Sequence, residues 1–117
     1  MSQYLVLFRN RSAADGYLLS PEDMARDMPA WQLWIGEMAL RGKLVATQPI
    51  GWEGVVISRE GTRAGPDLDA DSVVVAGYLI CEAKDLAEVR RWGMRCPILM
   101  YPHGRVEIRP VLPFSIL

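Results

Sequence analysis

The pattern of hydrophobic and polar positions along the chain predicts five β-strands. The first is an unbroken run of β-forming side chains, and the fourth is the most apolar segment of the chain. The last alternates between apolar and charged side chains, which is typical of a strand with one buried face. The predicted strands cover residues 3–8, 44–48, 54–58, 72–82 and 106–111.

A long amphipathic helix is predicted between the first two strands. Ser20 and Pro21 suit the N-cap and the first helical position, and Gly42 suits the end of the helix. Pro29 falls inside this segment, so we expect the helix either to bend there or to begin near it. One apolar stripe at three- and four-residue spacing defines the buried face: Met24, Met28, Trp31, Ile35 and Met38.

A second, shorter helix is predicted before the last strand. Asp85 suits its N-cap, Glu88 occupies the position that completes a capping box, and Pro97 ends it. Its apolar side consists of Leu86, Val89 and Trp92. The segment at residues 59–71 is polar and rich in turn-forming residues, so we expect it to be the longest irregular stretch.

The order of the predicted elements, β-α-β-β-β-α-β, is that of a ferredoxin-like α+β domain with one extra strand between the helices. No repeat or linker divides the chain, so we expect a single domain over residues 1–117. The strands at 3–8 and 72–82 are apolar on both faces, whereas two helices can cover only one face of the sheet. A second copy packed sheet to sheet is the simplest cover for the other face, so we expect a homodimer. The alternative is a monomer in which long loops fold over that face.

Composition argues against several classes of protein. The chain has 117 residues and a formal net charge of −1, which argues against binding nucleic acid through a basic surface. No apolar run approaches the roughly 20 residues of a membrane-spanning helix. The first residues lack the basic start of a signal peptide, so we expect a cytoplasmic protein with no membrane or nucleic-acid partner.

Two cysteines and one histidine limit the available metal and nucleophile chemistry. Cys81 and Cys96 lie in apolar surroundings, so we interpret both as small buried hydrophobic residues rather than as a disulfide or as nucleophiles. A zinc site would require both cysteines, His103 and a carboxylate at spacings that form no paired motif. His103 lies between Pro102 and Gly104, a sequence typical of a solvated turn. We therefore expect no metal site and no cofactor.

Three segments in the second half of the chain resemble one known family. They are Gly-Tyr-Leu-Ile-Cys-Glu-Ala-Lys-Asp-Leu-Ala-Glu at 77–88, Cys-Pro-Ile-Leu at 96–99 and Gly-Arg-Val-Glu-Ile-Arg-Pro-Val at 104–111. Together with Trp-Gln-Leu-Trp at 31–34 and Gly-Lys-Leu at 42–44, their order and spacing resemble the YCII-related (DGPF-domain) family. The resemblance implies a dimeric α/β barrel built from two ferredoxin-like protomers.

The chain departs from this family at two positions. The Asp-Gly-Pro-Phe motif that names the family is Ala-Gly-Pro-Asp at residues 64–67, without the leading carboxylate and the aromatic ring. In one branch of the family a helix histidine pairs with a carboxylate as a proposed acid–base dyad, and this histidine falls on Trp31. Tryptophan cannot exchange a proton at neutral pH, so the resemblance implies no such dyad here. Whether the protein is an enzyme therefore stays open.

Trp31 and Trp34 are the first candidate binding residues. Both lie on the first predicted helix and could wall an apolar pocket, with an indole N–H directed at a ligand. The alternative is that both belong to the core between helix and sheet. Trp31 is the better pocket candidate because it stands where the family has a polar site residue.

Asp67 and Arg109 are the charged candidates. Asp67 could act as a general base inside a pocket, or it could be one carboxylate of a solvated loop. Arg109 could anchor an anionic ligand, or it could form a structural ion pair with Glu107, Asp67 or Glu82. A metal site formed by the acidic residues at 67–71 would lack the glycine and the distal glutamate of a calcium loop.

These candidates predict a small anionic or aromatic ligand in a pocket between the first helix, the sheet and the loop at residues 64–67. The alternative is a non-catalytic homodimeric module that acts through a protein partner, and the resemblance implies a transcription regulator as one such partner. A concave site containing Trp31, Asp67 and Arg109 would favour the first hypothesis. A filled interior with an exposed apolar patch would favour the second.

Overall fold

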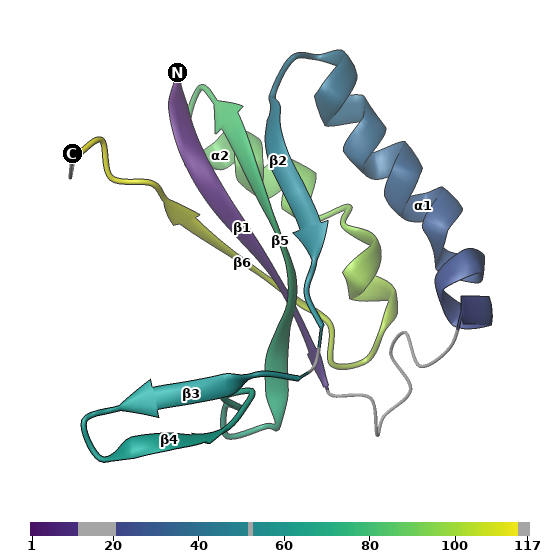
Figure 1. The fold of residues 1–117 in the computed structure, drawn as a ribbon. Helices are drawn as coiled ribbons and strands as arrows, with labels where there is room; N and C mark the ends of the chain where they lie inside the picture. Colours follow the sequence, from purple (N-terminus) through teal and green to yellow (C-terminus); the bar gives the residue numbers. More distant parts are fainter. Residues whose placement is uncertain (12–20, 52, 115–117) are drawn as a thin grey trace.

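The computed structural model describes residues 1–11, 21–51 and 53–114 of the chain. Ser20, the expected cap of the first helix, lies outside these residues. Figure 1 shows the elements in chain order. They are β1 (Ser2–Arg11), α1 (Pro21–Leu40), β2 (Leu44–Pro49), β3 (Val55–Ser58), β4 (Gly61–Ala64), β5 (Val73–Ala83), α2 (Leu86–Gly93), the short 3-10 helix η2 (Pro97–Met100) and β6 (Arg105–Pro110).

Four of the strands form one antiparallel sheet in the order β2-β5-β1-β6. α1 connects β1 to β2, and α2 with η2 connects β5 to β6. This order of strands and crossovers is a ferredoxin-like α+β fold, as the pattern of elements predicts. β1 and β5 lie at the centre of the sheet, which explains why both contain a long hydrophobic run.

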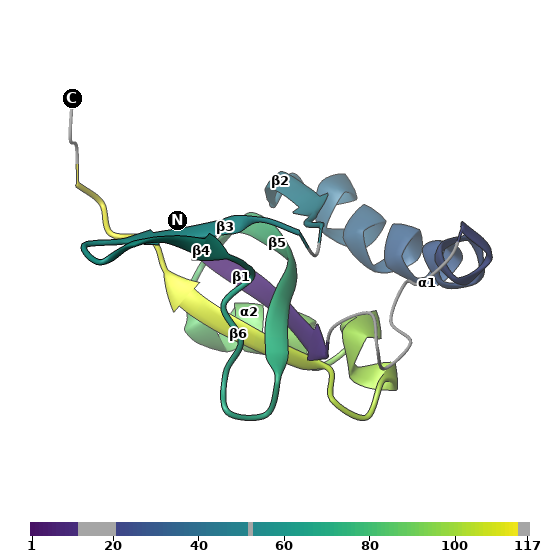
Figure 2. The ribbon, with the colours of Figure 1, turned by 60° about the horizontal axis from the view of Figure 1, so that its bottom comes forward.

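β3 and β4 form a separate hairpin that does not join the main sheet (Figure 2). The prediction that residues 59–71 are all irregular is therefore wrong, because residues 61–64 form β4. The pairing relies on backbone hydrogen bonds and on a turn at residues 59–60, which is followed by Gly61, whose φ of +132° favours glycine. The side chains of β4 are all exposed, so this strand leaves no hydrophobic pattern in the sequence.

β1 is longer than its hydrophobic pattern predicts. It continues past residue 8 as far as Arg11, and the polar residues at its end pair with the start of β5. A bulge between Phe8 and Arg9 shifts the register, so that Phe8 lies opposite Gly77 and Arg9 lies opposite Val75. Pairing with β5 thus extends the strand where its own side chains carry no strand signal.

One face of the sheet forms the hydrophobic core with the helices. Alternate residues of β1 are buried on this side, and β6 contributes Val106 and Ile108, which lie against Gly93 of α2. The buried residues at the centre of this core are Tyr4, Val6, Phe8, Leu79, Cys81, Trp34, Met38, Val89, Trp92 and Ile98.

The two α-helices differ in how closely they follow the prediction. α1 continues through Pro29 from residue 21, so a late start at the proline does not occur. The predicted cap of α2 is confirmed, because the Asp85 carboxylate accepts the backbone N–H of Glu88 at 2.9 Å. The Glu88 carboxylate in turn accepts the backbone N–H of Lys84 at 3.3 Å. Within the described residues, no helix is both long and apolar enough to cross a membrane.

The opposite face of the sheet carries a second set of apolar side chains. Leu5 lies opposite Ile80, and Leu7 lies opposite Tyr78, so the four side chains form one patch across the two central strands. All four are only half-buried, whereas their neighbours on the helix side are buried. α2 lies behind the sheet in Figure 1, on the side away from this patch. The sequence thus specifies two apolar faces, and the helices cover one of them.

Candidate functional site

A small cleft opens between α1 and the edge of the sheet formed by β2 and β5. Its volume is about 140 Å³. Apolar side chains of α1 and β1 form most of its wall, and the backbone of β5 at Ala76 and Gly77 contributes the sheet side. Side chains that line the cleft include Phe8, Met28, Trp31, Ile35, Thr47 and Asp27.

Trp31 forms part of the wall of the cleft, and edge-to-face packing with other aromatic rings holds its ring in place. The Trp31 ring centroid lies 4.9 Å from that of Phe8, with an angle of 73° between the ring planes. It lies 6.0 Å from that of Trp34, at 84°. Both geometries are favourable for aromatic pairs. Trp31 itself is only half-buried, so part of its indole borders the cleft.

Gly77 has no side chain, so β2 and the Phe8 ring can lie close to the backbone of β5 beside the cleft. A Cβ at this position would lie 3.1 Å from the carbonyl oxygen of Gln48 and 3.3 Å from the Phe8 ring. Thr47 strengthens the same junction, because its hydroxyl donates to the carbonyl of Tyr78 at 2.8 Å. The sheet side of the cleft is therefore built from tightly paired backbone.

Asp27 is the one acidic side chain among the described residues that line the cleft, and the sequence analysis did not single it out. Its side chain is only 8% exposed. Tyr101, which follows η2, donates its hydroxyl proton to Oδ2 of Asp27. The Nε of Arg26 lies 3.4 Å from Oδ1. Asp27 precedes Trp31 by four residues, so helical spacing places both on one face of α1. This spacing is the feature of the sequence that could have indicated Asp27 as a neighbour of Trp31.

The turn after η2 fixes the position of Tyr101. Its backbone N–H donates to the carbonyl of Ile98 at 3.2 Å, and its own carbonyl accepts the N–H of Gly104 at 3.0 Å. A Cβ at Gly104 would collide with the carbonyl of Ile98, so this turn needs glycine. His103 lies in the same turn, where it is half-buried rather than fully solvated, and it does not line the cleft.

Trp34 is part of the core that supports the cleft. It is 7% exposed, and its indole N–H donates to the carbonyl of Trp92 at 3.0 Å. This bond ties α1 to the end of α2 across the core. Of the two readings open from the sequence, the structure places Trp34 in the core and Trp31 at the cleft.

Asp67 and Arg109 lie away from the cleft. Asp67 follows the β3–β4 hairpin, where its exposed carboxylate pairs with Arg63, so the loop at residues 64–67 forms no wall of the cleft. Arg109 is exposed on β6 and lies opposite Leu5. Because Val106 and Ile108 pack toward the helices, the parity of β6 places Arg109 on the opposite side of the sheet.

The ion pair expected for Arg109 is not found in the described part of the chain. Glu107 instead lies 3.7 Å from Nε of Arg9, and Asp67 pairs with Arg63. The four candidates from the sequence therefore do not form one site. Trp31 lines the cleft and Trp34 supports it, while the two charged candidates lie elsewhere.

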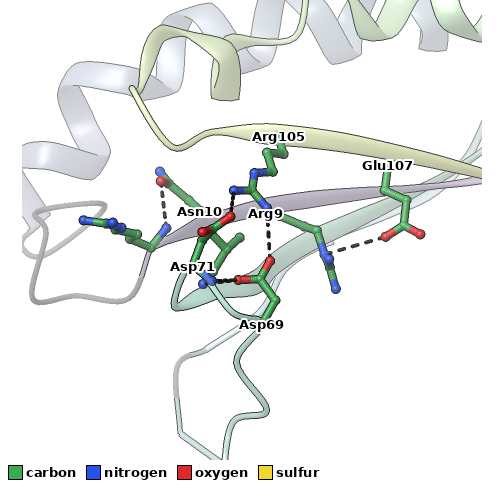
Figure 3. A network of polar contacts seen from close by, with 8 residues as sticks. Arg9, Asn10, Asp69, Asp71, Arg105 and Glu107 are labelled. Atoms are coloured by element: carbon green, nitrogen blue, oxygen red, sulfur yellow. Dashed lines mark hydrogen bonds and ion pairs between the residues drawn. The ribbon is translucent and has the colours of Figure 1, made fainter.

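The acidic residues after the hairpin bind an arginine on the other side of the sheet (Figure 3). Arg105 contacts Asp69 at 3.1 Å and Asp71 at 2.6 Å. Asp69 also accepts the backbone N–H of Val73 at 2.9 Å and that of Asp71 at 2.8 Å. The bond from Val73 is the main cause that lowers the pKa of Asp69 from its ordinary value of 3.8. This cluster fastens the start of β5 to β6, and the described residues include no group of three or more side chains suited to a metal ion.

The two cysteines are free and buried. Burial raises the pKa of Cys81 to about 11 and that of Cys96 to about 12. Both thiols are therefore protonated at neutral pH and are poor nucleophiles. Neither lines the cleft, so the structure supports their interpretation as small hydrophobic core residues.

The fold and the cleft together define a ferredoxin-like α+β domain with a small apolar hollow beside its first helix. The sequence model of the YCII-related domain matches residues 3–115, nearly the whole chain. The chain therefore belongs to the YCII-related family, which confirms the resemblance seen in its sequence.

One solved structure shows the same fold over most of its length. It is 5-chloro-2-hydroxyhydroquinone dehydrochlorinase (TftG) from Burkholderia phenoliruptrix AC1100, solved in complex with 2,5-dihydroxybenzoquinone. The sequence identity is 18%, the match covers 90% of each chain, and the TM-score is 0.51. At this identity the likeness supports the fold alone. No curated protein matches the chain.

Proposed function

We propose that this YCII-related domain binds a small aromatic molecule, one ring in size, in the cleft beside Trp31. The observation that carries the proposal is an apolar cleft of about 140 Å³ with an indole in its wall. A cavity of roughly 150 Å³ lined by apolar side chains is large enough for benzene. Flat rings also pack favourably against Trp31 and Phe8, which already adopt edge-to-face geometry.

The lining favours an aromatic ligand over an anionic one. Among the described residues of the cleft there is no lysine or arginine, and the charged group that is present is the Asp27 carboxylate. Arg109, which the sequence offers as a candidate anion anchor, lies on the other side of the sheet. An anion in the cleft would face a carboxylate without a lining cation to compensate it. The TftG complex contains a single-ring quinone, which guides the choice of probes but assigns no activity to this chain.

The proposal concerns binding and assigns no reaction. No histidine or cysteine is found among the described residues that line the cleft, and the buried thiols are protonated at neutral pH. Acid–base chemistry in the cleft would therefore depend on Asp27. The alternative is that the domain acts through a protein partner. Failure of the cleft to bind any small molecule would favour this alternative.

Thermal unfolding of the purified protein with single-ring probes tests the proposal. Toluene, phenol and benzoate cover the apolar, hydroxylated and anionic cases. A probe present at 100 times its Kd stabilises the folded state by about 2.7 kcal/mol, which raises Tm by several degrees in a domain of this size. Trp31→Ala should remove the shift, whereas Leu33→Ala, at an exposed position of the same helix, should keep it. Unchanged Tm with every ring probe would contradict the proposal.

We also propose that the open face of the sheet packs against a second copy of the chain, which gives a dimeric α/β barrel. The half-buried patch of Leu5, Leu7, Tyr78 and Ile80 supports this proposal, because contiguous apolar surface of this kind marks interfaces. Arg109 and Glu82 lie on the same face, and neither has an ion pair among the described residues, so each can pair with its opposite on the second copy.

Two further apolar segments project from the body on the side away from α1 in Figures 1 and 2. One is the hairpin, in which Ile57 is 75% exposed, and the other is the segment after β6, with Leu112 and Phe114. A second copy on the open face would provide apolar surface for both segments. The homodimer and the ligand cleft use different faces of the molecule, so the two proposals stand independently.

A further inference from the structure

Asp27 has more hydrogen-bonding capacity than the described residues use. An ionised carboxylate has about four acceptor positions. Among the described residues, Oδ2 accepts the hydroxyl of Tyr101, and Oδ1 faces Nε of Arg26 at 3.4 Å, which is long for such a bond. The side chain is 92% removed from solvent, since its exposed fraction is 8%, so water supplies few donors. A carboxylate in this position is stabilised by a further donor from within the cleft.

The surroundings of Asp27 favour a neutral donor rather than a cation. The guanidinium of Arg26 already stands beside the carboxylate and offsets its charge. The remaining walls are mostly apolar, so an ammonium group would lose hydration without meeting a second carboxylate among the described lining residues. A ring carboxylate would repel Asp27. A hydroxyl group adds the missing donor without adding charge.

We propose that Asp27 accepts a hydrogen bond from a ring hydroxyl, so that the cleft selects phenol-type molecules over rings without a donor. This inference rests on the proposed function and names the ligand class of the same site. In this arrangement the ring lies against Trp31 and the apolar wall, one helical turn from Asp27. Tyr101, fixed by the turn after η2, donates to this carboxylate and restrains its position, and Asp27 is one of the residues that line the cleft.

The test compares phenol with toluene, which has nearly the same size and shape but no donor. Both are titrated into the protein and followed by calorimetry. Hydrogen bonds to charged groups are strong enough that phenol should bind the wild type at least about tenfold more tightly. In Asp27→Asn the acceptor is neutral, so the preference for phenol should fall about fivefold or more, while the affinity for toluene changes little. Glu37→Gln is the matched control, because Glu37 lies on the same helix, pairs with Arg95 and does not line the cleft.

Each outcome of this comparison is decisive. Equal affinity for phenol and toluene overturns the inference but leaves the aromatic cleft in place. Tighter binding of benzylammonium or benzoate than of phenol also overturns it, because the ligand class is then charged. Binding of none of the rings means that the proposed function fails, and the inference fails with it. If Asp27→Asn does not fold, the wild-type preference for phenol over toluene still decides the inference.

Discussion

At the scale of single residues, Asp27, Trp31 and Trp34 have three different roles on one helix. Trp31 lines the cleft, Asp27 is an acidic residue of its lining, and Trp34 fastens the helix to the core through its bond to the carbonyl of Trp92. The sequence indicates the two tryptophans through their spacing but cannot say which one borders a cleft. It also hides Asp27, because a charged residue next to an apolar stripe usually faces solvent.

Trp34→Phe should lower the free energy of unfolding by about 2–4 kcal/mol. The change removes the indole N–H, leaves the buried carbonyl of Trp92 without its donor, and opens a small cavity beside Phe8. Urea unfolding followed by circular dichroism measures the loss. Leu33→Ala is the control. Leu33 precedes Trp34 on the helix and is 71% exposed, so this substitution should lower the free energy of unfolding by no more than about 0.5 kcal/mol. Equal, small losses in both variants would show that Trp34 is not part of the core.

At the scale of elements, the sequence predicts the main sheet and both helices well because each of them carries a hydrophobic pattern or a capping motif that local structure requires. The central strands are hydrophobic, α2 begins at a recognisable cap, and β6 alternates. β4 and the end of β1 escape prediction because they are held by pairing with a neighbouring strand rather than by buried side chains. The position of Asp67 escapes prediction for the same reason, because it depends on the β3–β4 hairpin, whose orientation leaves no pattern in the sequence.

The connection between β4 and β5 should loosen in acid at a pH below 3.8. The pKa of Asp69 is lowered in the folded state, so the stabilisation from its carboxylate is complete above the unfolded value and is lost as pH falls through the lowered one. The backbone N–H of Val73 donates to this carboxylate, so its NMR shift should titrate with a midpoint below 3.8. Asp69→Asn should abolish that titration. A midpoint at or above 3.8 would contradict this role of Asp69.

At the scale of the whole molecule, the two faces of the sheet have different roles. The helix face contains the core and, at its edge, the cleft, whereas the open face presents apolar side chains beside Arg109 and Glu82, which have no ion pair among the described residues. The sequence predicts both apolar faces, because a continuous hydrophobic run in a strand places apolar side chains on both sides of the sheet. It cannot specify the cleft, because the cleft depends on where α1 lies against β2.

The wild type should have a solution mass about twice the 13.1 kDa of one chain. Ile80→Asp places a charge at the centre of the open face and should give monomers, because an unpaired charge in a dimer interface is costly. Light scattering after size-exclusion chromatography gives both masses. Leu33→Asp is the control at an exposed site on α1 and should remain dimeric. A monomeric wild type at high concentration, or a dimeric Ile80→Asp, would rule out this interface.

A crystal structure of the protein with 4-bromophenol would show whether the cleft beside Trp31 binds an aromatic ring. The anomalous signal of bromine locates the ring without reliance on its weak density. We expect one strong peak inside the cleft between Trp31 and the backbone of β5, with the hydroxyl toward Asp27. Bromine peaks only at the surface, or at the open face of the sheet, would contradict the claim.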